Sequence, residues 1–294
     1  MFLWKREIMK IDSQKVFRAD GSRRTALITG GGFGIGRELC RLFHAAGFNL
    51  VVVSLLTEEL TKIKSELDAR SSGQEVIVYQ IDLSAPDAAF QVVKFCEEKK
   101  INVDVLVNNA GFGLAGRVVD QPLNRLIQMM GLNLVTTTIL CNAFGGKMRE
   151  HGFGMILNVA STTSFQPLPF WAVYAGTKSY VSSFTQAIAS ELRPFGVIVS
   201  CLYPGITRTK FLDTAGLHHS TQRWSVGSMI HKFAMNPMNV ARTAFTGLMC
   251  GKRRIVPGLI NKLHFFFIQL VPNPLILAVV NMVMKRYRNP EVNH

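Results

Sequence analysis

A regular alternation of short apolar runs with segments of helical period, from Arg24 onward, constrains the fold of this chain more than any other feature. Seven runs have the length of strands and are rich in valine, isoleucine and leucine without polar alternation, which is typical of strands buried on both faces. Stretches between them, such as GRELCRLFHAAG, have helical spacing. Alternating strands and helices predict an α/β fold, a doubly wound parallel sheet of about seven strands with helices on both faces. The seven runs are TALIT, NLVVV, EVIVYQ, VDVLVN, GMILNV, GVIVSCLY and RRIV.

The length and composition fit one folded domain with additions at its ends. A chain of 294 residues with 48% hydrophobic and 18% charged residues suits a single globular α/β domain. We assign residues 23–257 to this domain, residues 1–22 to a basic N-terminal arm and residues 258–294 to an apolar C-terminal helical extension. The arm begins MFLWKREIMK, which meets charge after four residues and so lacks the apolar core of a signal peptide.

The C-terminal extension consists of two apolar segments separated by Pro272 and Pro274. Neither segment reaches the ~20 residues that a membrane-spanning helix needs, and prolines break a helix that would join them. We therefore predict a pair of helices. They could cap a pocket, form a subunit interface, or lie on a bilayer surface with Lys285, Arg286 and Arg288 at the headgroups.

The chain carries a formal net charge of +14, from 33 lysines and arginines against 19 acids. Between Leu192 and Pro290 thirteen basic residues stand against one acid, Asp213, so most of the excess lies in the last third. Basic clusters favour anionic partners such as acidic lipid, nucleic acid or a phosphorylated substrate, although a basic surface that only aids solubility has the same composition. We expect no nucleic-acid partner, because apolar stretches interrupt the basic residues.

The five cysteines lie far apart, with no C-x-x-C pair and no histidine at the spacing of metal ligands. This distribution favours reduced thiols in a cytosol-facing compartment over a disulfide framework or a zinc site. We therefore expect a cytoplasmic protein without a metal centre. The cysteines are Cys40, Cys96, Cys141, Cys201 and Cys250.

A glycine-rich turn follows the first predicted strand in ALITGGGFGIGREL. Glycines permit a tight turn and let backbone approach a pyrophosphate, which then rests on the positive N-terminus of the next helix. Any strand-to-helix turn can use glycine, but this position in a parallel sheet favours a dinucleotide site.

The end of the second predicted strand bears on the choice of cofactor. An acid there would bind the adenosine ribose and repel a 2′-phosphate. This chain has Ser54, Leu55 and Leu56 instead, which favours NADP over NAD without excluding NAD. Arg37, in the first turn of the preceding helix, is a candidate to bind the phosphate; its other interpretation is a solvated helix residue.

Over residues 24–256 the sequence resembles the classical short-chain dehydrogenase/reductase family, which implies a Rossmann-like fold. The resemblance rests on several motifs in the family's order: TGGGFGIG, the DLS at Asp82, NNAG at residues 108–111, NLVTT with Asn133, NVAS with Ser161, Tyr174-x-x-x-Lys178, and PGITRT at residues 204–209.

The resemblance implies hydride transfer with a catalytic set formed by Tyr174, Lys178, Ser161 and Asn133. A ketone that accepts hydride becomes an alkoxide and needs a proton donor beside its oxygen. Tyr174 would be that donor, with a pKa that the Lys178 cation, one helical turn away, should lower. Ser161 would orient the carbonyl, and Asn133 would hold a water that links Lys178 to solvent.

Each of these residues also has a purely structural interpretation. Ser161 could cap a turn, Asn133 could bond backbone inside its helix, and Tyr174 with Lys178 could be an ordinary i,i+4 pair. The presence of the complete set favours catalysis.

The resemblance also implies the residues that line the cofactor. Asn109 would lie near the ribose, Thr207 near the nicotinamide amide, and Asp82 with Leu83 at the adenine; Asp82 could equally be a helix N-terminal acid. Phe33 fills a family position that is more often small or basic. The complete expected set is Thr29, Gly30, Gly34, Ile35, Gly36, Ser54, Asp82, Leu83, Asn109, Ala110, Gly111, Tyr174, Lys178, Pro204, Gly205 and Thr207.

Two apolar segments flank the expected site. TTSFQPLPFWAV precedes Tyr174 and would wall a hydrophobic pocket, unless it packs at a subunit contact. The segment after Thr209 is where the family keeps its mobile substrate lid, and His218 and His219 within it are expected to face solvent. The apolar side chains are Phe165, Leu168, Phe170 and Trp171 in the first segment and Phe211, Leu217, Trp224 and Met229 in the second.

These features together predict an NADP-dependent carbonyl reductase or alcohol dehydrogenase. Its substrate would be a hydrophobic ketone or secondary alcohol, such as a 3-oxoacyl thioester or a steroid, taken near the cytoplasmic face of an anionic membrane. The family resemblance implies a homo-oligomer, a dimer or tetramer. The alternative is a non-catalytic dinucleotide-binding sensor or scaffold on the same fold.

Overall fold

The computed structural model describes residues 12–209, 211, 234–268 and 270–285, and it contains the predicted parallel sheet. Seven strands lie in the order β3-β2-β1-β4-β5-β6-β7, and every neighbouring pair is parallel. Their positions confirm all seven runs of the sequence, with ends that differ by at most one residue. The strands are β1 Thr25–Thr29, β2 Asn49–Ser54, β3 Val76–Gln80, β4 Val103–Asn108, β5 Gly154–Val159, β6 Val197–Leu202 and β7 Arg254–Ile255.

The strand order reverses direction at β1, which pairs with β2 on one side and β4 on the other. The connections that leave the carboxyl ends of β1 and β4 run toward opposite halves of the sheet, so a crevice opens between them. The glycine-rich turn and the NNAG loop follow β1 and β4 directly. The topology therefore brings both motifs to one point.

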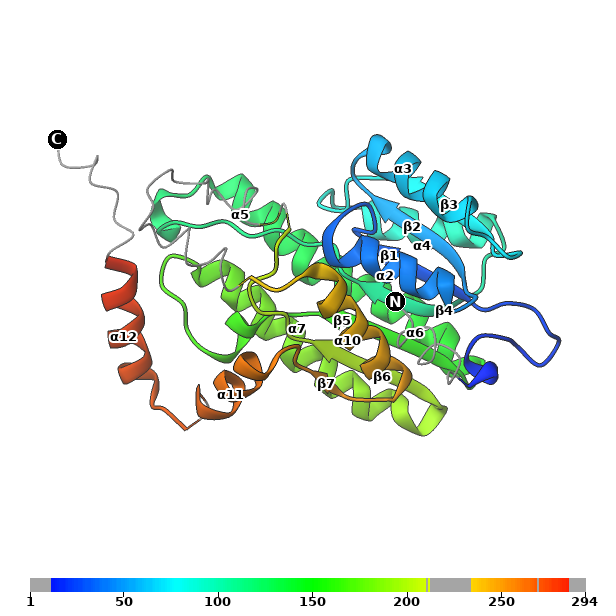
Figure 1. Ribbon diagram of the computed structural model, residues 1–294. Coiled ribbons are helices and arrows are strands. Elements are labelled where there is room, and N and C mark those ends of the chain that lie inside the picture. Colours follow the sequence, from blue (N-terminus) through cyan, green and yellow to red (C-terminus); the bar gives the residue numbers. More distant parts are fainter. Residues whose placement is uncertain (1–11, 210, 212–233, 269, 286–294) are drawn as a thin grey trace.

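Helices cover both faces of the sheet, as Figure 1 shows. On one face α2, α3 and α10 bury their apolar sides, and Phe43 of α2 packs edge-on against Phe48 and Phe245. On the other face α4, α6 and α7 pack over β1, β4, β5 and β6. The helices are α2 Gly34–Ala45, α3 Thr57–Asp68, α4 Ala88–Glu98, α5 Leu123–Met130, α6 Thr137–Glu150, α7 Ala172–Leu192 and α10 Pro237–Met249.

One continuous helical stretch, Leu123–Glu150, is long and apolar enough to cross a membrane by length and composition alone. It joins α5 to α6 through the π-helical segment η3, Gly131–Thr136. Its α6 part packs against β4 and β5, and Asn133 in its middle is 1% exposed and hydrogen-bonded within the protein. These contacts identify the α6 part of this stretch as a core helix of the fold.

The N-terminal arm is tied to the sheet by a buried charge cluster. Asp104 of β4 accepts hydrogen bonds from Arg18 Nη2 at 2.5 Å, Arg24 Nη1 at 2.9 Å and the Thr25 amide at 2.8 Å. The short 3-10 helix η1, Ser13–Lys15, lies at the start of the arm, where Lys15 Nζ donates to Met249 O at 2.6 Å. The described part of the arm is therefore anchored at both β4 and α10.

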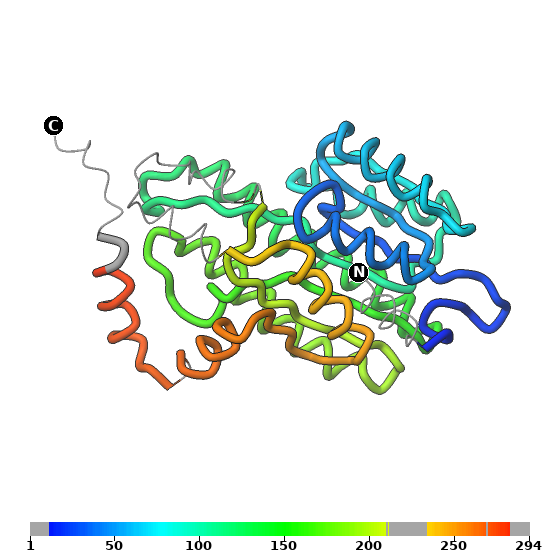
Figure 2. Tube along the Cα trace, in the orientation of Figure 1, coloured from blue at the N-terminus to red at the C-terminus, as the bar shows by residue number. Residues whose placement is uncertain are grey.

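The C-terminal extension forms the predicted pair of helices, α11 Leu259–Ile268 and α12 Asn273–Lys285. The ring of Phe265 in α11 packs against Phe165 with centroids 4.6 Å apart, so α11 docks on the loop that follows β5. Figure 2 shows the chain continuing from α11 to α12 at the side of the molecule away from β3. Arg286 and Arg288 lie outside the described residues.

Candidate active site

The glycine-rich turn after β1 is packed too tightly for larger residues. Gly30 and Gly34 have φ of +64° and +57°, which favour glycine. A Cβ at Gly36, in the first turn of α2, would overlap the carbonyl oxygen of Gly30. Phe33 precedes α2 without a side-chain cap, so the first amides of the helix have no capping side chain. This cradle fits a pyrophosphate, as the sequence pattern predicts.

Thr29 and Asn109 hold this turn against the loop after β4. The Asn109 and Ala110 amides each donate to Thr29 Oγ1 at 3.0 Å. The Asn109 side chain donates to Thr29 O at 3.0 Å and Gly30 O at 3.1 Å. The amide of Asn109, which we expect near the cofactor ribose, thus also shapes the glycine turn.

The end of β2 meets the glycine turn beside a carboxylate from α3. A Cβ built on Gly32 would lie 2.8 Å from both Ser54 Oγ and Glu59 Oε2. Arg37 is directed elsewhere, since its Nη2 lies 2.9 Å from Glu66 Oε2. Glu66 also binds Arg41 at 2.7 Å, and these hydrogen bonds lower the pKa of Glu66 to about 2. The corner that should receive the adenosine ribose therefore contains an acid that the strand-end pattern did not predict.

Asp82 and Leu83 lie at the start of the connection from β3 to α4. Asp82 Oδ1 accepts hydrogen bonds from the Ser84 amide at 2.9 Å and the Ser84 hydroxyl at 2.7 Å, so it caps a turn ahead of α4, which begins only at Ala88. Leu83 is buried, and its carbonyl accepts from Thr136 at 2.9 Å. Asp82 is exposed, so its second carboxylate oxygen remains open to a ligand.

Tyr174 is buried near the start of α7, and the side chain of Ser161 lies close enough to its hydroxyl to affect its pKa. Burial raises the pKa of Tyr174 to about 12, while the nearby Ser161 hydroxyl opposes the rise. Desolvation is the largest effect on this pKa, and it acts against the lowering that we expect from Lys178. Ser161 also caps the 3-10 helix η4, Thr162–Phe165, by accepting from the Thr163 amide at 3.1 Å.

Lys178 lies on the same face of α7 as Tyr174, with its Nζ 5.9 Å from the centre of the tyrosine ring. Nζ donates to the carbonyl oxygen of Val159 at 2.9 Å. Burial lowers the pKa of Lys178 to about 8. A Cβ on Gly111 would lie 3.3 Å from this Nζ, so the glycine of the NNAG loop leaves room for the ammonium group.

Asn133 joins the loop after β4 to α7. Its Nδ2 donates to Phe112 O at 3.1 Å and to Thr177 Oγ1 at 3.0 Å, and its Oδ1 accepts from the Phe112 amide at 3.3 Å. The side chain thus binds a neighbouring loop and not the backbone of its own helix. The π-helical geometry of Gly131–Thr136 places this amide in the interior.

Apolar rings surround Tyr174. Trp171 packs edge-on against it with centroids 5.6 Å apart, and Phe211 lies at 5.4 Å. A Cβ on Gly113 would lie 2.9 Å from Trp171, 3.0 Å from Phe211 and 3.2 Å from Tyr174. Leu126, Met129, Phe112 and Leu114 complete this cluster.

The remaining apolar residues before Tyr174 have different surroundings. Phe165 packs on Tyr203 and on the tail helix α11. Phe170 has a φ of +65°, strained for a bulky residue, and its carbonyl accepts from Gly116 at 2.7 Å. Of the four side chains expected in the pocket wall, Trp171 is the one that packs on Tyr174.

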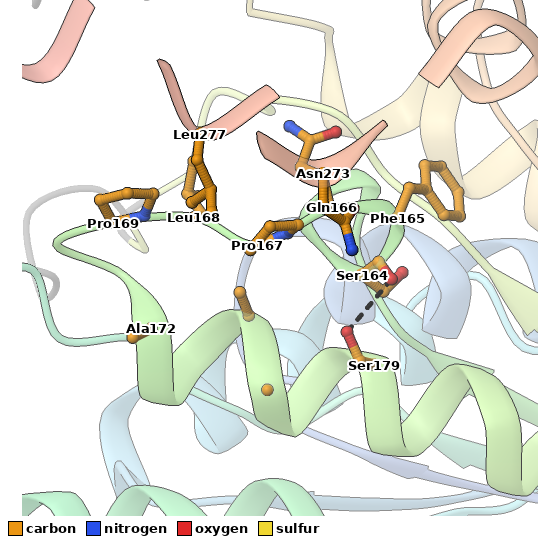
Figure 3. Close-up of a pocket in the computed structure, with 12 residues that line it drawn as sticks. Ser164, Phe165, Gln166, Pro167, Leu168, Pro169, Ala172, Ser179, Asn273 and Leu277 are labelled. Carbon is orange, nitrogen blue, oxygen red and sulfur yellow. Dashed lines mark hydrogen bonds between the residues drawn. The ribbon is translucent and has the colours of Figure 1, made fainter. Parts of the chain in front are cut away.

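A cavity of about 520 Å³ lies between the loop after Ser161, the start of α7 and α12. Figure 3 shows Leu168, Pro169 and Leu277 at one end, with Ser164, Ser179 and Asn273 at the other. Tyr174 and Lys178 are not among its lining residues, because Ala175, Gly176 and Ser179 occupy a different face of α7. The tail therefore caps a cavity next to the expected active site.

The structure brings the expected catalytic residues together, and the last cofactor motif lies close by. Thr207 is buried and donates to Gly205 O at 2.9 Å, and Pro204 accepts a hydrogen bond from the Thr162 amide at 3.0 Å. Lid positions Leu217, His218, His219, Trp224 and Met229 lie outside the described residues. Within the described ranges, no three histidines, cysteines or acids gather where they could hold a metal ion.

The sequence pattern missed three residues that shape this site: Glu59, Gly113 and Thr177. Each belongs to an element next to a recognised motif, and each is brought in by packing. Glu59 could have been found by extending the search for an acid from the end of β2 into the first turn of α3.

Comparison with known proteins gives consistent results. The family model described as short chain dehydrogenase matches residues 24–219. A short chain dehydrogenase of Pseudocercospora fijiensis is 30% identical over 69% of this chain and 67% of its own length. The Mycobacterium tuberculosis protein named "Probable oxidoreductase EphD" is 31% identical over 65% of this chain, which spans only 32% of that relative. The structure of a Sphingobium yanoikuyae short-chain dehydrogenase in complex with NADPH has a TM-score of 0.74 and 25% identity, covering 92% of this chain and 98% of the other.

Proposed function

The chain belongs to the short-chain dehydrogenase/reductase family and is an NAD(P)-dependent oxidoreductase, and we propose that its substrates are a hydrophobic ketone and the corresponding secondary alcohol, which it interconverts. The observation that carries this substrate class is the surroundings of Tyr174. The expected proton donor lies among Trp171, Phe211 and Leu114, so a carbonyl that reaches it must enter an apolar environment. A bound nicotinamide dinucleotide supplies or accepts the hydride.

The tyrosine is in the correct protonation state to assist reduction. With a pKa of about 12, Tyr174 stays protonated at neutral pH and can donate its proton as an alkoxide forms. We infer that Ser161, whose hydroxyl lies near Tyr174, donates to the same substrate oxygen and fixes the carbonyl. The two hydroxyls thus provide a proton and an oxyanion contact.

Lys178 and Asn133 complete the expected catalytic set around Tyr174. The Lys178 ammonium is held by Val159 O, and the missing side chain of Gly111 leaves space beside it. Asn133 fixes the loop that carries Gly111 through both Phe112 backbone groups. We infer that Lys178 stabilises the tyrosinate after proton transfer and that Asn133 keeps the loop in register for proton resupply.

Two observations bear on the choice of nicotinamide cofactor, and they favour opposite answers. The Sphingobium yanoikuyae relative binds NADPH, which supports NADP. In this chain, Glu59 in the first turn of α3 directs its carboxylate toward Gly32 and Ser54, and an acid beside the end of β2 would support NAD. For the substrate itself, we propose a 3-oxoacyl thioester or a steroid.

Activity with a panel of ketones, measured beside a conservative variant, tests this function. We expect turnover of long-chain or steroidal ketones by the purified protein and a loss of at least about 100-fold in Tyr174→Phe. Tyr180→Phe is the matched control, because Tyr180 lies on the same helix, is 40% exposed and bonds Thr138 on the surface. Cofactor binding without turnover of any ketone would contradict the enzyme and support the sensor alternative.

We further propose that the tail attaches the enzyme to an anionic membrane surface. α11 and α12 expose large apolar side chains in one run of chain, and Lys262 on α11 with Lys252 and Arg253 before β7 are exposed cations. Apolar insertion combined with basic contacts is the usual design of an interfacial helix. The exposed apolar residues are Leu259, Ile260, Leu263, Phe266, Phe267, Leu270, Leu275, Val279 and Met282.

Flotation with vesicles tests the membrane proposal. We expect the protein to float with phosphatidylcholine vesicles that contain phosphatidylserine and to float less with phosphatidylcholine alone. The double variant Leu263→Asp/Phe267→Asp should remain in solution. Phe90→Asp is the control, because Phe90 is 59% exposed on α4 and lies far from the tail in the chain. Equal behaviour of the two variants would contradict this attachment.

We also propose that the enzyme is a homo-oligomer, as is common in its family. α6 and α7 lie next to one another, and Val135, Tyr180 and Phe195 near them are large apolar side chains that are 51%, 40% and 47% exposed. A second copy could cover such side chains. Light scattering of the purified protein measures the mass, and a monomer at micromolar concentration would contradict this proposal.

A further inference from the structure

The cavity of about 520 Å³ under α12 lies outside the catalytic set. Its volume falls within the range of about 300 to 1,000 Å³ that small-molecule sites occupy. Three elements form its walls: residues 164–169 after β5, one face of α7 between Ala172 and Ser179, and Asn273 with Leu277 of α12. The tail therefore creates a cavity that the sheet and its covering helices alone would not enclose.

This cavity and the catalytic residues lie on different faces of α7. Tyr174 and Lys178 share the face that carries the catalytic set, and neither of them lines the cavity. Spacings of four and three residues place Ala172, Gly176 and Ser179 together on another face of the helix. A molecule in the cavity therefore binds apart from the reacting groups.

α12 is packed on the protein where it covers the cavity. Ile276 lies between Asn273 and Leu277 and is 5% exposed. The preceding helix α11 docks through the ring of Phe265 on Phe165, which is itself a lining residue. Both tail helices thus hold this wall of the cavity in place.

The polar end of the cavity offers hydrogen-bond acceptors. Ser179 Oγ donates to Ser164 O at 3.1 Å, as Figure 3 shows, and Ser164 Oγ donates to Ser161 O. Both hydroxyl protons are therefore used within the protein, and no described residue donates to either hydroxyl oxygen. A hydroxyl oxygen whose proton is engaged can still accept a hydrogen bond. A ligand that complements this end carries a hydrogen-bond donor.

The other end of the cavity is apolar, with Leu168, Pro169 and Leu277 gathered there in Figure 3. None of the described residues that line the cavity is charged, since its remaining polar groups are the amides of Gln166 and Asn273. An ionised ligand group would lose water here without gaining a counter-charge. The lining therefore favours a neutral molecule with an apolar body.

We propose that this cavity binds a neutral alcohol with an apolar chain, at a site separate from the catalytic centre. The hydroxyl group donates to Ser164 or Ser179, and the chain lies against Leu168 and Leu277. Two sources can supply this chemistry: a neutral glycerolipid of a membrane, or the secondary alcohol that the proposed reaction forms. The site goes beyond the proposed function, because binding in it requires neither cofactor nor hydride transfer.

Equilibrium dialysis of the purified full chain against alkyl probes measures this binding directly. The probes decanol, decyl methyl ether and decanoate share an apolar chain and differ in the polar group. We expect decanol to bind about fivefold more tightly than the ether, which has no donor, and at least about tenfold more tightly than the anion. Ser179→Ala should remove most of the difference between the alcohol and the ether, because it removes one acceptor.

A variant that fills the cavity tests where the alcohol binds. A Cβ at Gly176 meets no atom within 4 Å, so Gly176→Leu places a side chain in the cavity without a clash at its base. It should weaken decanol binding at least about tenfold, since two groups cannot share one space. Gly146→Leu is the matched control, because Gly146 lies on α6 in equally open surroundings and outside the cavity. Leucine is a better helix former than glycine, so both variants should fold, which thermal unfolding verifies.

The outcomes separate this site from other binding surfaces and from the proposed function. Unchanged decanol affinity in Gly176→Leu would overturn the site, because the alcohol would then lie at Tyr174 or on the exposed tail. Equal binding of the alcohol and the ether would overturn the role of the two serines. Loss of the site would leave the oxidoreductase intact, and failure of every ketone would leave the site intact.

Two further probes identify the source of the ligand. Monodecanoylglycerol represents the membrane lipid, and the secondary isomer of decanol represents the product of the reaction. Tighter binding of either one than of decanol supports the site and assigns its source. Binding of neither would overturn the proposal, because the cavity would then exclude both natural forms of this chemistry.

Discussion

The ammonium of Lys178 donates to the carbonyl oxygen of Val159 at 2.9 Å, so the last residue of β5 holds the lysine beneath Tyr174. The side chain is 5% exposed, and burial lowers its pKa to about 8 from the model-peptide value of 10.5. A group with a depressed pKa binds fewer protons in the folded state than in the unfolded state. The fold therefore carries an energetic cost for keeping this lysine charged.

This cost leads to a prediction for Lys178→Met. The folded-state penalty is fully present below pH 8 and disappears as the pH rises from about 8 toward 10.5, so the wild type should gain stability over that interval. At pH 7 the free energy of unfolding of the variant should exceed that of the wild type by on the order of 3 kcal/mol. This difference should shrink as the pH rises toward 10.5. Urea unfolding at pH 7 and pH 9 measures both effects, because pH 9 lies below both the ordinary tyrosine pKa of 10.0 and the raised pKa of Tyr174.

The control for this experiment is Lys62→Met, which removes an exposed lysine from α3. It should leave the pH dependence of the unfolding free energy unchanged. A Lys178→Met variant that is less stable than the wild type at pH 7 would show that the hydrogen bond to Val159 outweighs the desolvation of the ammonium.

The buried carboxylate of Asp104 leads to a second prediction. It accepts hydrogen bonds from Arg18, Arg24 and the Thr25 amide, and Asp104 is 5% exposed. Asp104→Ala would leave two partly buried guanidinium groups without their acid, at a cost of roughly 3 to 5 kcal/mol. Urea unfolding at neutral pH measures the loss.

Asp68→Ala is the comparison for Asp104. Asp68 pairs with Lys64 at 3.0 Å, but its side chain is 46% exposed, so its removal should cost less than about 1 kcal/mol. Similar losses in the two variants would contradict the view that the arm is anchored through Asp104.

The sheet could be predicted almost completely from the sequence, because buried parallel strands have an unmistakable composition. NLVVV and GMILNV have no polar alternation, and each lies within a strand of the sheet. The two tail helices were also predictable, because Pro272 prevents a single helix. Local composition determines these elements, so no knowledge of packing is needed.

The partners of the site residues could not be predicted in the same way. Asn109 was expected at the cofactor, yet its amide bonds Thr29 O and Gly30 O, a choice that depends on the pairing of β1 with β4. Glu59 reaches the glycine turn because α3 crosses the face of the sheet near β2. The high pKa of Tyr174 depends on how deeply its ring is buried, which spacing along a helix does not reveal.

The glycine turn leads to a third prediction, with an internal comparison. Gly36→Ala would drive a methyl group into Gly30 O and shift α2 relative to the turn, so cofactor affinity should fall by more than about tenfold. Gly146→Ala adds the same methyl group to α6, where no atom lies within 4 Å. That variant should bind cofactor normally and gain up to about 1 kcal/mol of stability, because alanine is the better helix former. Fluorescence titration and thermal unfolding measure both. Equal cofactor affinity in the two variants would contradict a cradle at Gly36.

Gly113 leads to the last prediction, which separates substrate from cofactor. Its missing side chain leaves space in which Trp171, Phe211 and Tyr174 meet, and an added Cβ would lie 2.9 to 3.2 Å from these three rings. Gly113→Ala must therefore displace at least one ring by a few tenths of an ångström. Misplacement of the proton donor should lower kcat about tenfold or more, whereas nicotinamide affinity should stay within about twofold of the wild type. Steady-state kinetics with the best ketone, combined with cofactor titration, distinguishes the two effects. If kcat is unchanged and KM alone rises, the glycine serves substrate access and Tyr174 tolerates the added methyl group.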